Sequence, residues 1–150
     1  MAVDPRPVEP AFGFVFRAAG RTLAVSGDTR ASTALIEAAR GCDLLVHEAF
    51  VHDALPMVPG VREAATIGAA ATYRTALAEV GAIASAARAR ALLLAHLVPP
   101  GVDPAPLVAE AARRVPGPVI AGEDLRILDL ADGRVIRGGL HARRGGWAAG

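Results

Sequence analysis

Four apolar stretches of strand length, each ending in polar side chains, constrain most strongly what this chain can fold into. They read "LAVSGD", "DLLVHEAF", "ALLLAH" and "PVIAGED", and a helical pattern separates each from the next. Buried strands that alternate with helices are typical of α/β proteins, whose parallel strands end at one edge of a sheet. Polar residues at that edge often carry the chemistry. We therefore expect an α/β fold with a mixed sheet and flanking helices, with its functional residues at the strand ends.

Turn residues predict a β-hairpin near each end of the chain. The first hairpin turns at Ala18-Ala19-Gly20 and the second at Asp132-Gly133, because short turns of this type favour hairpins. Helices are expected over residues 33–40, in two pieces over 62–90, and over 105–115. The proline- and glycine-containing residues 51–62 are expected to form a loop. A domain over 1–140 is expected, with a disordered tail over 141–150.

The composition excludes several classes of protein. A chain of 150 residues that is 53% hydrophobic can form one domain with a buried core. A net charge of +1 gives no strong field toward DNA or a membrane, and no apolar run has the length of a membrane span. Cys42 is the single cysteine, which excludes an internal disulfide and a thiolate zinc cluster. A cytoplasmic location is therefore expected.

Two readings remain open for the polar residues at the strand ends. Asp28 suits a turn that starts a helix, but its two carboxylate oxygens could also bridge two metal ions. His96 could be a structural, hydrogen-bonded histidine or a zinc ligand. His47 and Glu48 could act as an acid–base pair or orient other groups. The four histidines, at 47, 52, 96 and 141, form no His-x-His pair, so these residues alone do not complete a zinc hydrolase site.

Several motifs in register resemble a known family. The segments "GRTLAVSGDTR", "LIEAARGCDLLVHEAF", "TYRTALAEVGAIA", "ALLLAHLVPP" and "VIAGEDLRI" resemble the second half of metallo-β-lactamase-fold hydrolases. The branch they resemble most includes ribonuclease Z and its phosphodiesterase and arylsulfatase-like relatives. The resemblance implies the C-terminal half of an αβ/βα sandwich.

The resemblance also implies roles for individual residues. Asp28 matches the family aspartate that bridges two zinc ions, and His96 matches a histidine that ligates one of them. His47 and Glu48 match a His-Glu-Ala motif that helps shape the loop near the site without ligating the metal. Arg74 stands where the family has a histidine that donates a proton to the leaving group, and a guanidinium is a poor donor at neutral pH.

The family's His-x-His-x-Asp-His motif, which supplies further metal ligands, does not occur in this sequence. We therefore expect an incomplete zinc site, and an isolated chain with weak or no activity. One hypothesis is a metal-dependent hydrolase of phosphodiester or related ester bonds, such as those of RNA or a small ester, completed by a partner that carries the missing N-terminal half. A sheet face left uncovered without that half also predicts self-association or a partner. The alternative is a non-catalytic remnant or binding module that keeps the scaffold.

Overall fold

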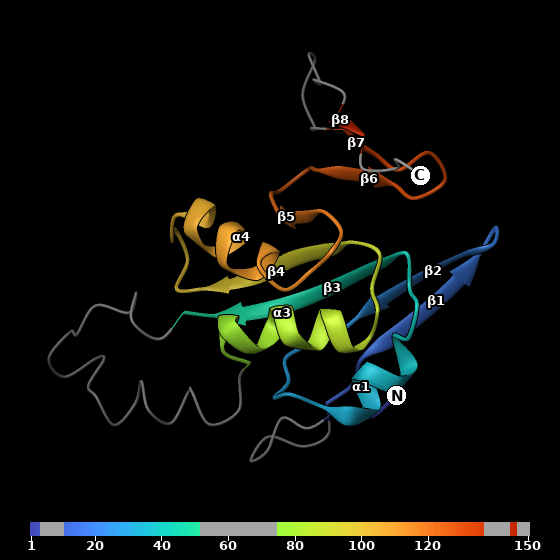
Figure 1. The fold of residues 1–150 in the computed structure, drawn as a ribbon, viewed down its shortest axis with the longest axis horizontal. Helices are drawn as coiled ribbons and strands as arrows, with labels where there is room; N and C mark the ends of the chain where they lie inside the picture. Colours follow the sequence, from blue (N-terminus) through green and yellow to red (C-terminus); the bar gives the residue numbers. More distant parts are fainter. Residues whose placement is uncertain (4–10, 52–74, 137–144, 147–150) are drawn as a thin grey trace, which may run out of the picture.

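The computed structural model describes residues 1–3, 11–51, 75–136 and 145–146, and places their main strands in one mixed sheet (Figure 1). The strand order is β1-β2-β3-β4-β5. Strand bounds are β1 Phe14–Ala18, β2 Arg21–Val25, β3 Leu44–Phe50, β4 Leu92–Val98 and β5 Val119–Ala121. The helices are α1 Thr33–Ala38, α3 Leu77–Ala86 and α4 Pro104–Ala112. A smaller sheet consists of β6 Ile127–Asp129, β7 Arg134–Ile136 and β8 Gly145–Gly146.

The direction of the strands confirms the expected α/β fold with a mixed sheet. β1 pairs antiparallel with β2, and β2, β3, β4 and β5 pair parallel to their neighbours. The β1–β2 hairpin turns at Ala19 and Gly20, whose φ angles are +49° and +72°. Two successive positive φ values are those of a type I′ turn, whose twist suits a hairpin. The second expected hairpin is also present, as β6 and β7.

The helices were predicted in the right places where the structure describes them. α1 starts after Ser32, whose side chain accepts a hydrogen bond from the Leu35 N–H, so it is capped as serine commonly caps helices. α4 starts with Asp103 as its cap and Pro104 at its first position. α3 covers the second piece of the helix expected over 62–90, whereas residues 62–74 and most of the loop 51–62 lie outside the described residues. In the tail 141–150, Gly145–Gly146 are described as the strand β8.

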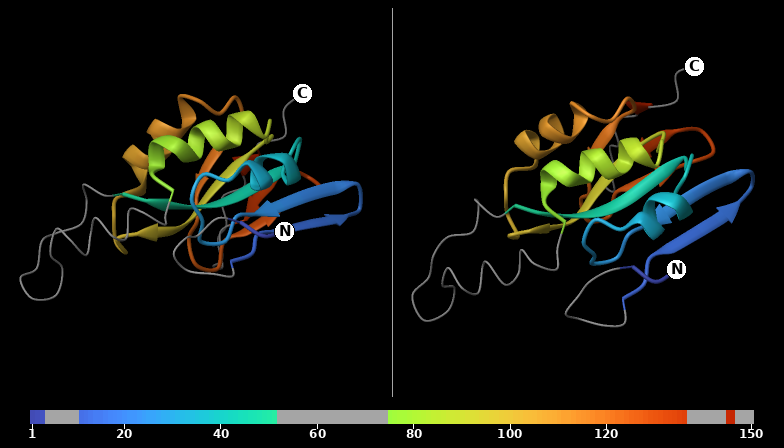
Figure 2. Two further views of the ribbon diagram at one scale, coloured as in Figure 1. Left: turned by 90° about the horizontal axis from the view of Figure 1, so that it is seen from below. Right: turned by 60° about the horizontal axis from the view of Figure 1, so that its bottom comes forward.

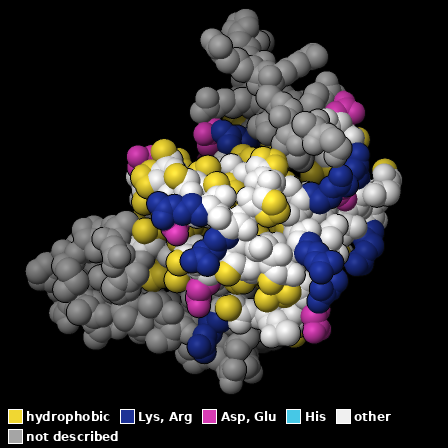
Figure 3. Space-filling model, viewed as in Figure 1, with side chains coloured by type: hydrophobic (Ala, Val, Ile, Leu, Met, Phe, Trp, Pro, Cys, Tyr) yellow, Lys and Arg dark blue, Asp and Glu magenta, His cyan; other side chains and the backbone are white. Residues whose placement is uncertain are grey.

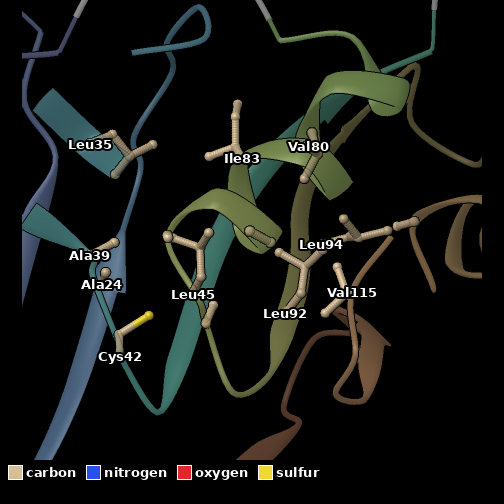
Figure 4. Close-up of a cluster of buried hydrophobic side chains, with 14 of the residues drawn as sticks. Ala24, Leu35, Ala39, Cys42, Leu45, Val80, Ile83, Leu92, Leu94 and Val115 are labelled. Carbon is tan, nitrogen blue, oxygen red and sulfur yellow. The ribbon is translucent and has the colours of Figure 1, made fainter. Parts of the chain in front are cut away.

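One face of the five-stranded sheet is covered by all three described helices (Figure 2). Its inward residues Ala24, Leu45, Leu92 and Leu94 are fully buried and pack in one cluster with residues of α1, α3 and α4 (Figure 4). Seven residues of this cluster are alanines, and they lie in the helices, in the strands and in the segments that join them. Small side chains let helices lie close to the sheet, which explains how a chain with 4% aromatic residues still forms a close-packed core.

The opposite face of the same sheet is also apolar but is far less covered. Cross-strand partners share a face, so the register puts Phe14 beside Val25 and Phe16 beside Leu23. The row continues through Val46, Leu93 and Ile120. These seven residues are half-buried or exposed, and Phe14 and Phe16 are 53% and 55% exposed with stacked rings 6.2 Å apart, whereas Leu44, the partner of Leu23 on this face, is buried. We call these seven residues the open face.

Charged side chains lie at the edge of the sheet where β3 begins. Asp43 accepts hydrogen bonds from the Arg21 guanidinium (3.2 Å) and the Thr22 N–H (2.8 Å), and Arg90 lies 3.4 Å away. Partial burial alone would raise the pKa of Asp43, but these partners together hold that pKa below its usual value. Arginine and acidic side chains are interspersed over the surface seen in Figure 3. None of the described helices is long and apolar enough to cross a membrane.

The unequal cover of the two sheet faces predicts unequal costs for the same substitution. Leu45→Ala leaves a cavity under the helices and should lower the free energy of unfolding by about 2–5 kcal/mol. Leu23→Ala, on the open face, should cost clearly less because Leu23 keeps part of its surface in water in the folded state. Urea denaturation of both variants measures the difference. Equal losses would show that the open face is as well buried as the core.

Candidate metal centre

The turn after β2 is shaped by a glycine that no other residue could replace without strain. Gly27 has φ +65°, and a Cβ added to it would lie 2.5 Å from the carbonyl oxygen of Phe12. Glycine alone adopts this conformation readily and lets the backbones approach so closely. The turn therefore presents Asp28 at the end of the strand, where its side chain is 50% exposed.

His96 reaches the same place through an irregularity in β4. Glu48 pairs with Ala95, and the next residue of β3, Ala49, pairs with Leu97, so His96 is an extra residue in its strand. Its φ of +46° is uncommon for a residue with a side chain. Extra residues of this kind redirect a side chain next to functional sites. The bulge accounts for the exposure of His96, which is 51% for its side chain.

Glu48 is the buried member of the group. Its side chain is only 2% exposed, and its Oε1 accepts a hydrogen bond of 2.8 Å from the buried N–H of Thr29, the residue after Asp28. The Glu48 N–H in turn donates to the Ser26 hydroxyl at 3.2 Å. Glu48 thus ties the end of β3 to the turn that carries Asp28.

The three side chains meet at the edge where the parallel strands end. One possible ligand atom from each of Asp28, Glu48 and His96 lies within 4.8 Å of the others. His96 Nδ1 lies 2.7 Å from Asp28 Oδ1 and 3.8 Å from Glu48 Oε2. Two carboxylates and an imidazole are donors that suit zinc and several other divalent metals. This donor set fits a metal, and it could provide at most three of the four ligands usual at zinc.

His47 lies apart from this group, although it neighbours Glu48 in sequence. It faces the helix-covered side of the sheet, is fully buried, and its Nδ1–H donates to the Glu48 carbonyl oxygen at 2.7 Å. Burial lowers the pKa of His47 to about 4, although that hydrogen bond acts in the opposite direction. The ring is therefore neutral at pH 7. Among the described residues its Nε2 has no hydrogen-bond partner.

The structure brings together two of the expected ligands and adds a third residue to them. Asp28 and His96 were expected as metal ligands, and Glu48 only as a supporting residue. Arg74 lies outside the described residues. The sequence did contain a signal for Glu48, since two buried strands that pair in parallel align their ends, and Glu48 and His96 both stand at such ends. The register that aligns them was not available from the sequence.

No family model matches the chain, but curated proteins do. Ribonuclease Z of Methanosarcina acetivorans is 34% identical over 111 residues, which are 74% of this chain and 33% of that protein. Ribonuclease Z of Myxococcus xanthus is 37% identical over 117 residues, 77% of this chain and 35% of that protein. The putative ribonuclease Z of Mycobacterium tuberculosis is 30% identical over 130 residues, 85% of this chain and 56% of that protein.

A solved structure agrees with these relatives. The metallo-β-lactamase-fold protein YhfI from Bacillus subtilis matches with a TM-score of 0.62 and 22% identity, over 82% of this chain and 45% of that chain. The chain is similar in sequence to ribonuclease Z and has part of the metallo-β-lactamase fold. This confirms the resemblance expected from the motifs. The chain spans between a third and about half of the length of the curated relatives named above.

The hydrogen bond between Glu48 and Thr29 predicts how two substitutions of Glu48 differ. Glu48→Ala removes the acceptor of a buried N–H and should lower the free energy of unfolding by about 1–3 kcal/mol. Glu48→Gln keeps an acceptor oxygen and should cost less. Glu37→Ala, on an exposed glutamate of α1, is the control and should change little. If Glu48→Ala were as stable as the parent in urea denaturation, the bond to Thr29 would not be holding the turn.

Proposed function

We propose that this chain carries one part of a metal-dependent phosphodiesterase of the ribonuclease Z type. The observation that carries the proposal is the cluster of Asp28, Glu48 and His96 at the strand ends of a ribonuclease Z-like fold. Fold alone does not define activity, but donors of this kind are what a catalytic metal requires. RNA or a small ester is the proposed substrate.

In this proposal the three residues have different tasks. Asp28 and His96, each about half exposed, would hold a metal ion, with zinc as the expected metal. Glu48, buried and bonded to the Thr29 N–H, would keep Asp28 and His96 in register and offer its second oxygen to the same site. A metal bound here would supply an activated water and would stabilise charge on the phosphoryl oxygens.

The remaining metal ligands would come from polypeptide outside this sequence. Glu48 lies on the same face of β3 as Val46, since side chains two residues apart share a face. The apolar open face therefore borders the group formed by Asp28, Glu48 and His96. A polypeptide that covered the open face would reach the cluster, and we propose that the remaining part of the fold does so. Without it, the chain is expected to self-associate through the open face. The cytoplasmic location stays a prediction.

A non-catalytic remnant is the second candidate, and Arg74 favours it. The family histidine expected at this position would donate a proton, whereas a guanidinium holds its proton too tightly to do so. A remnant would keep the scaffold and at most a weak metal site.

The isolated chain should bind zinc weakly, because Asp28, Glu48 and His96 leave its coordination incomplete. After desalting, its zinc content should be well below one ion per chain, with near-background hydrolysis of bis-p-nitrophenyl phosphate. Adding a polypeptide with the His-x-His-x-Asp-His half should raise both. Asp28→Ala should abolish the gain, and Asp124→Ala, an exposed acid of the same edge, should not.

In the completed complex, Arg74→His should raise activity further. No gain of zinc on adding the second half would favour the remnant. Stoichiometric zinc with strong activity in the isolated chain would refute the view that its site is incomplete.

The open face predicts association of the isolated chain. Size-exclusion chromatography should show species larger than the monomer, and the dye ANS should bind. Phe14→Ser combined with Phe16→Ser should reduce both signals because the exposed aromatic surface is removed. Ile127→Ser, on the exposed Ile127 of the smaller sheet, should leave them unchanged. A monomer that binds no ANS would contradict the proposal that this face seeks a partner.

A further inference from the structure

The turn after β5 combines two unfavourable features in one residue. Leu125 has φ +62°, a left-handed conformation that costs a residue with a side chain roughly 1–2 kcal/mol. Leu125 is also 81% exposed, the most of the large apolar residues described as exposed. Neither feature helps the fold. Strained residues of this kind persist where the surroundings hold them and where function uses them.

The surroundings do hold this turn firmly. The Arg126 N–H donates to the Glu123 carbonyl oxygen at 3.1 Å, which closes a four-residue turn with Leu125 at its third position. Glycine or asparagine is preferred there when φ is positive. The Arg126 side chain is only 15% exposed, pairs with Glu123 at 2.7 Å, and also donates to the Ala121 carbonyl oxygen. Leu125 is therefore presented in a fixed position.

The turn that contains Leu125 starts at the sheet edge that carries Asp28, Glu48 and His96. The Gly122 N–H donates to the Leu94 carbonyl oxygen at 2.7 Å, and a Cβ on Gly122 would lie 3.7 Å from Cα of Ala95. Ala95 immediately precedes His96. Because β4 and β5 are parallel, the turn stands at the same edge of the sheet as Asp28 and Glu48.

We propose that Leu125 is a specificity-determining residue that contacts an aromatic group of the substrate ester. This inference rests on the proposed function, in which Asp28 and His96 face the phosphodiester centre. Leu125 would add apolar surface to an edge whose other described residues include two exposed carboxylates, Glu123 and Asp124. A ligand that covers an exposed apolar side chain removes its surface from water, and this lowers the free energy of the complex. The aromatic face of a nucleobase or an aryl ester has that chemistry.

The test compares two phosphodiesters that differ only in their ester groups. Binding of diphenyl phosphate and of dimethyl phosphate is measured by saturation-transfer NMR with zinc in excess, on the chain combined with the polypeptide that carries the His-x-His-x-Asp-His half. The parent should prefer diphenyl phosphate. Leu125→Gly and Leu125→Asn should weaken that binding roughly fivefold, as expected for losing part of one leucine contact. Binding of dimethyl phosphate should not change.

A second readout separates contact with substrate from a role in the fold. Both variants accept a positive φ more readily than leucine, so their melting temperatures should equal or exceed that of the parent. Ile127→Ser is the control and should not alter binding of either ester. A lower melting temperature for both variants would make Leu125 structural and overturn the inference.

Two further outcomes distinguish this inference from the proposed function. If the parent binds diphenyl phosphate better and both variants do so equally well, Leu125 does not select the substrate, although the proposed function stands. If neither ester binds the parent in a zinc- and Asp28-dependent way, the proposed function fails and this inference fails with it.

Discussion

The parallel pairing of β2, β3 and β4 is the constraint on which the rest of the structure depends. Parallel neighbours end at the same edge, so residues near the ends of three separate strands are brought together there. Asp28, Glu48 and His96 are far apart in sequence yet offer ligand atoms within 4.8 Å of one another. The helices between these strands make the pairing possible, because a parallel connection must cross back over the sheet. The alanine-rich core under these helices thus serves the site by fixing the register.

Backbone conformations that are unfavourable in most proteins gather at this same edge. His96 and Leu125 both have positive φ, and each stands where a strand gives way to a turn or bulge. Two other residues with side chains and positive φ, Ala19 and Arg88, stand in a hairpin turn and just after α3, where such angles are ordinary. The edge that carries Asp28, Glu48 and His96 therefore contains, among the described residues, the two strained backbone conformations that no hairpin turn or helix end accounts for. That pattern is common at functional sites.

The helices and strands could be predicted from the sequence, whereas the strand register and the distances between side chains could not. Alternation of strands and helices and the cap at Asp103 were readable because each depends on neighbouring residues. The bulge at His96 was not readable, since it arises from how β4 meets β3. Glu48 was expected to support the site rather than join it, because its distance from His96 depends on strand register. Leu125 carried no signal, since glycine or asparagine is the usual residue at a turn position with positive φ and leucine does not indicate one.

Large aromatic side chains lie on the less covered face of the sheet, and this favours association with a second surface. Three of its four phenylalanines, at 12, 14 and 16, are more than half exposed, while the helix-covered face is packed largely with alanine, leucine and valine. In a chain with so few aromatic residues, burying them in its own core would contribute strongly to the stability of the fold. This chain instead displays them at alternate positions along the edge strand. Burial against another surface would release far more hydrophobic free energy than the folded chain now obtains from them. Glu48 lies on the same face of the sheet, two strands away on β3. Under the proposed function, stability and completion of the site would therefore be coupled, because a partner that covered this face could also reach Asp28 and His96.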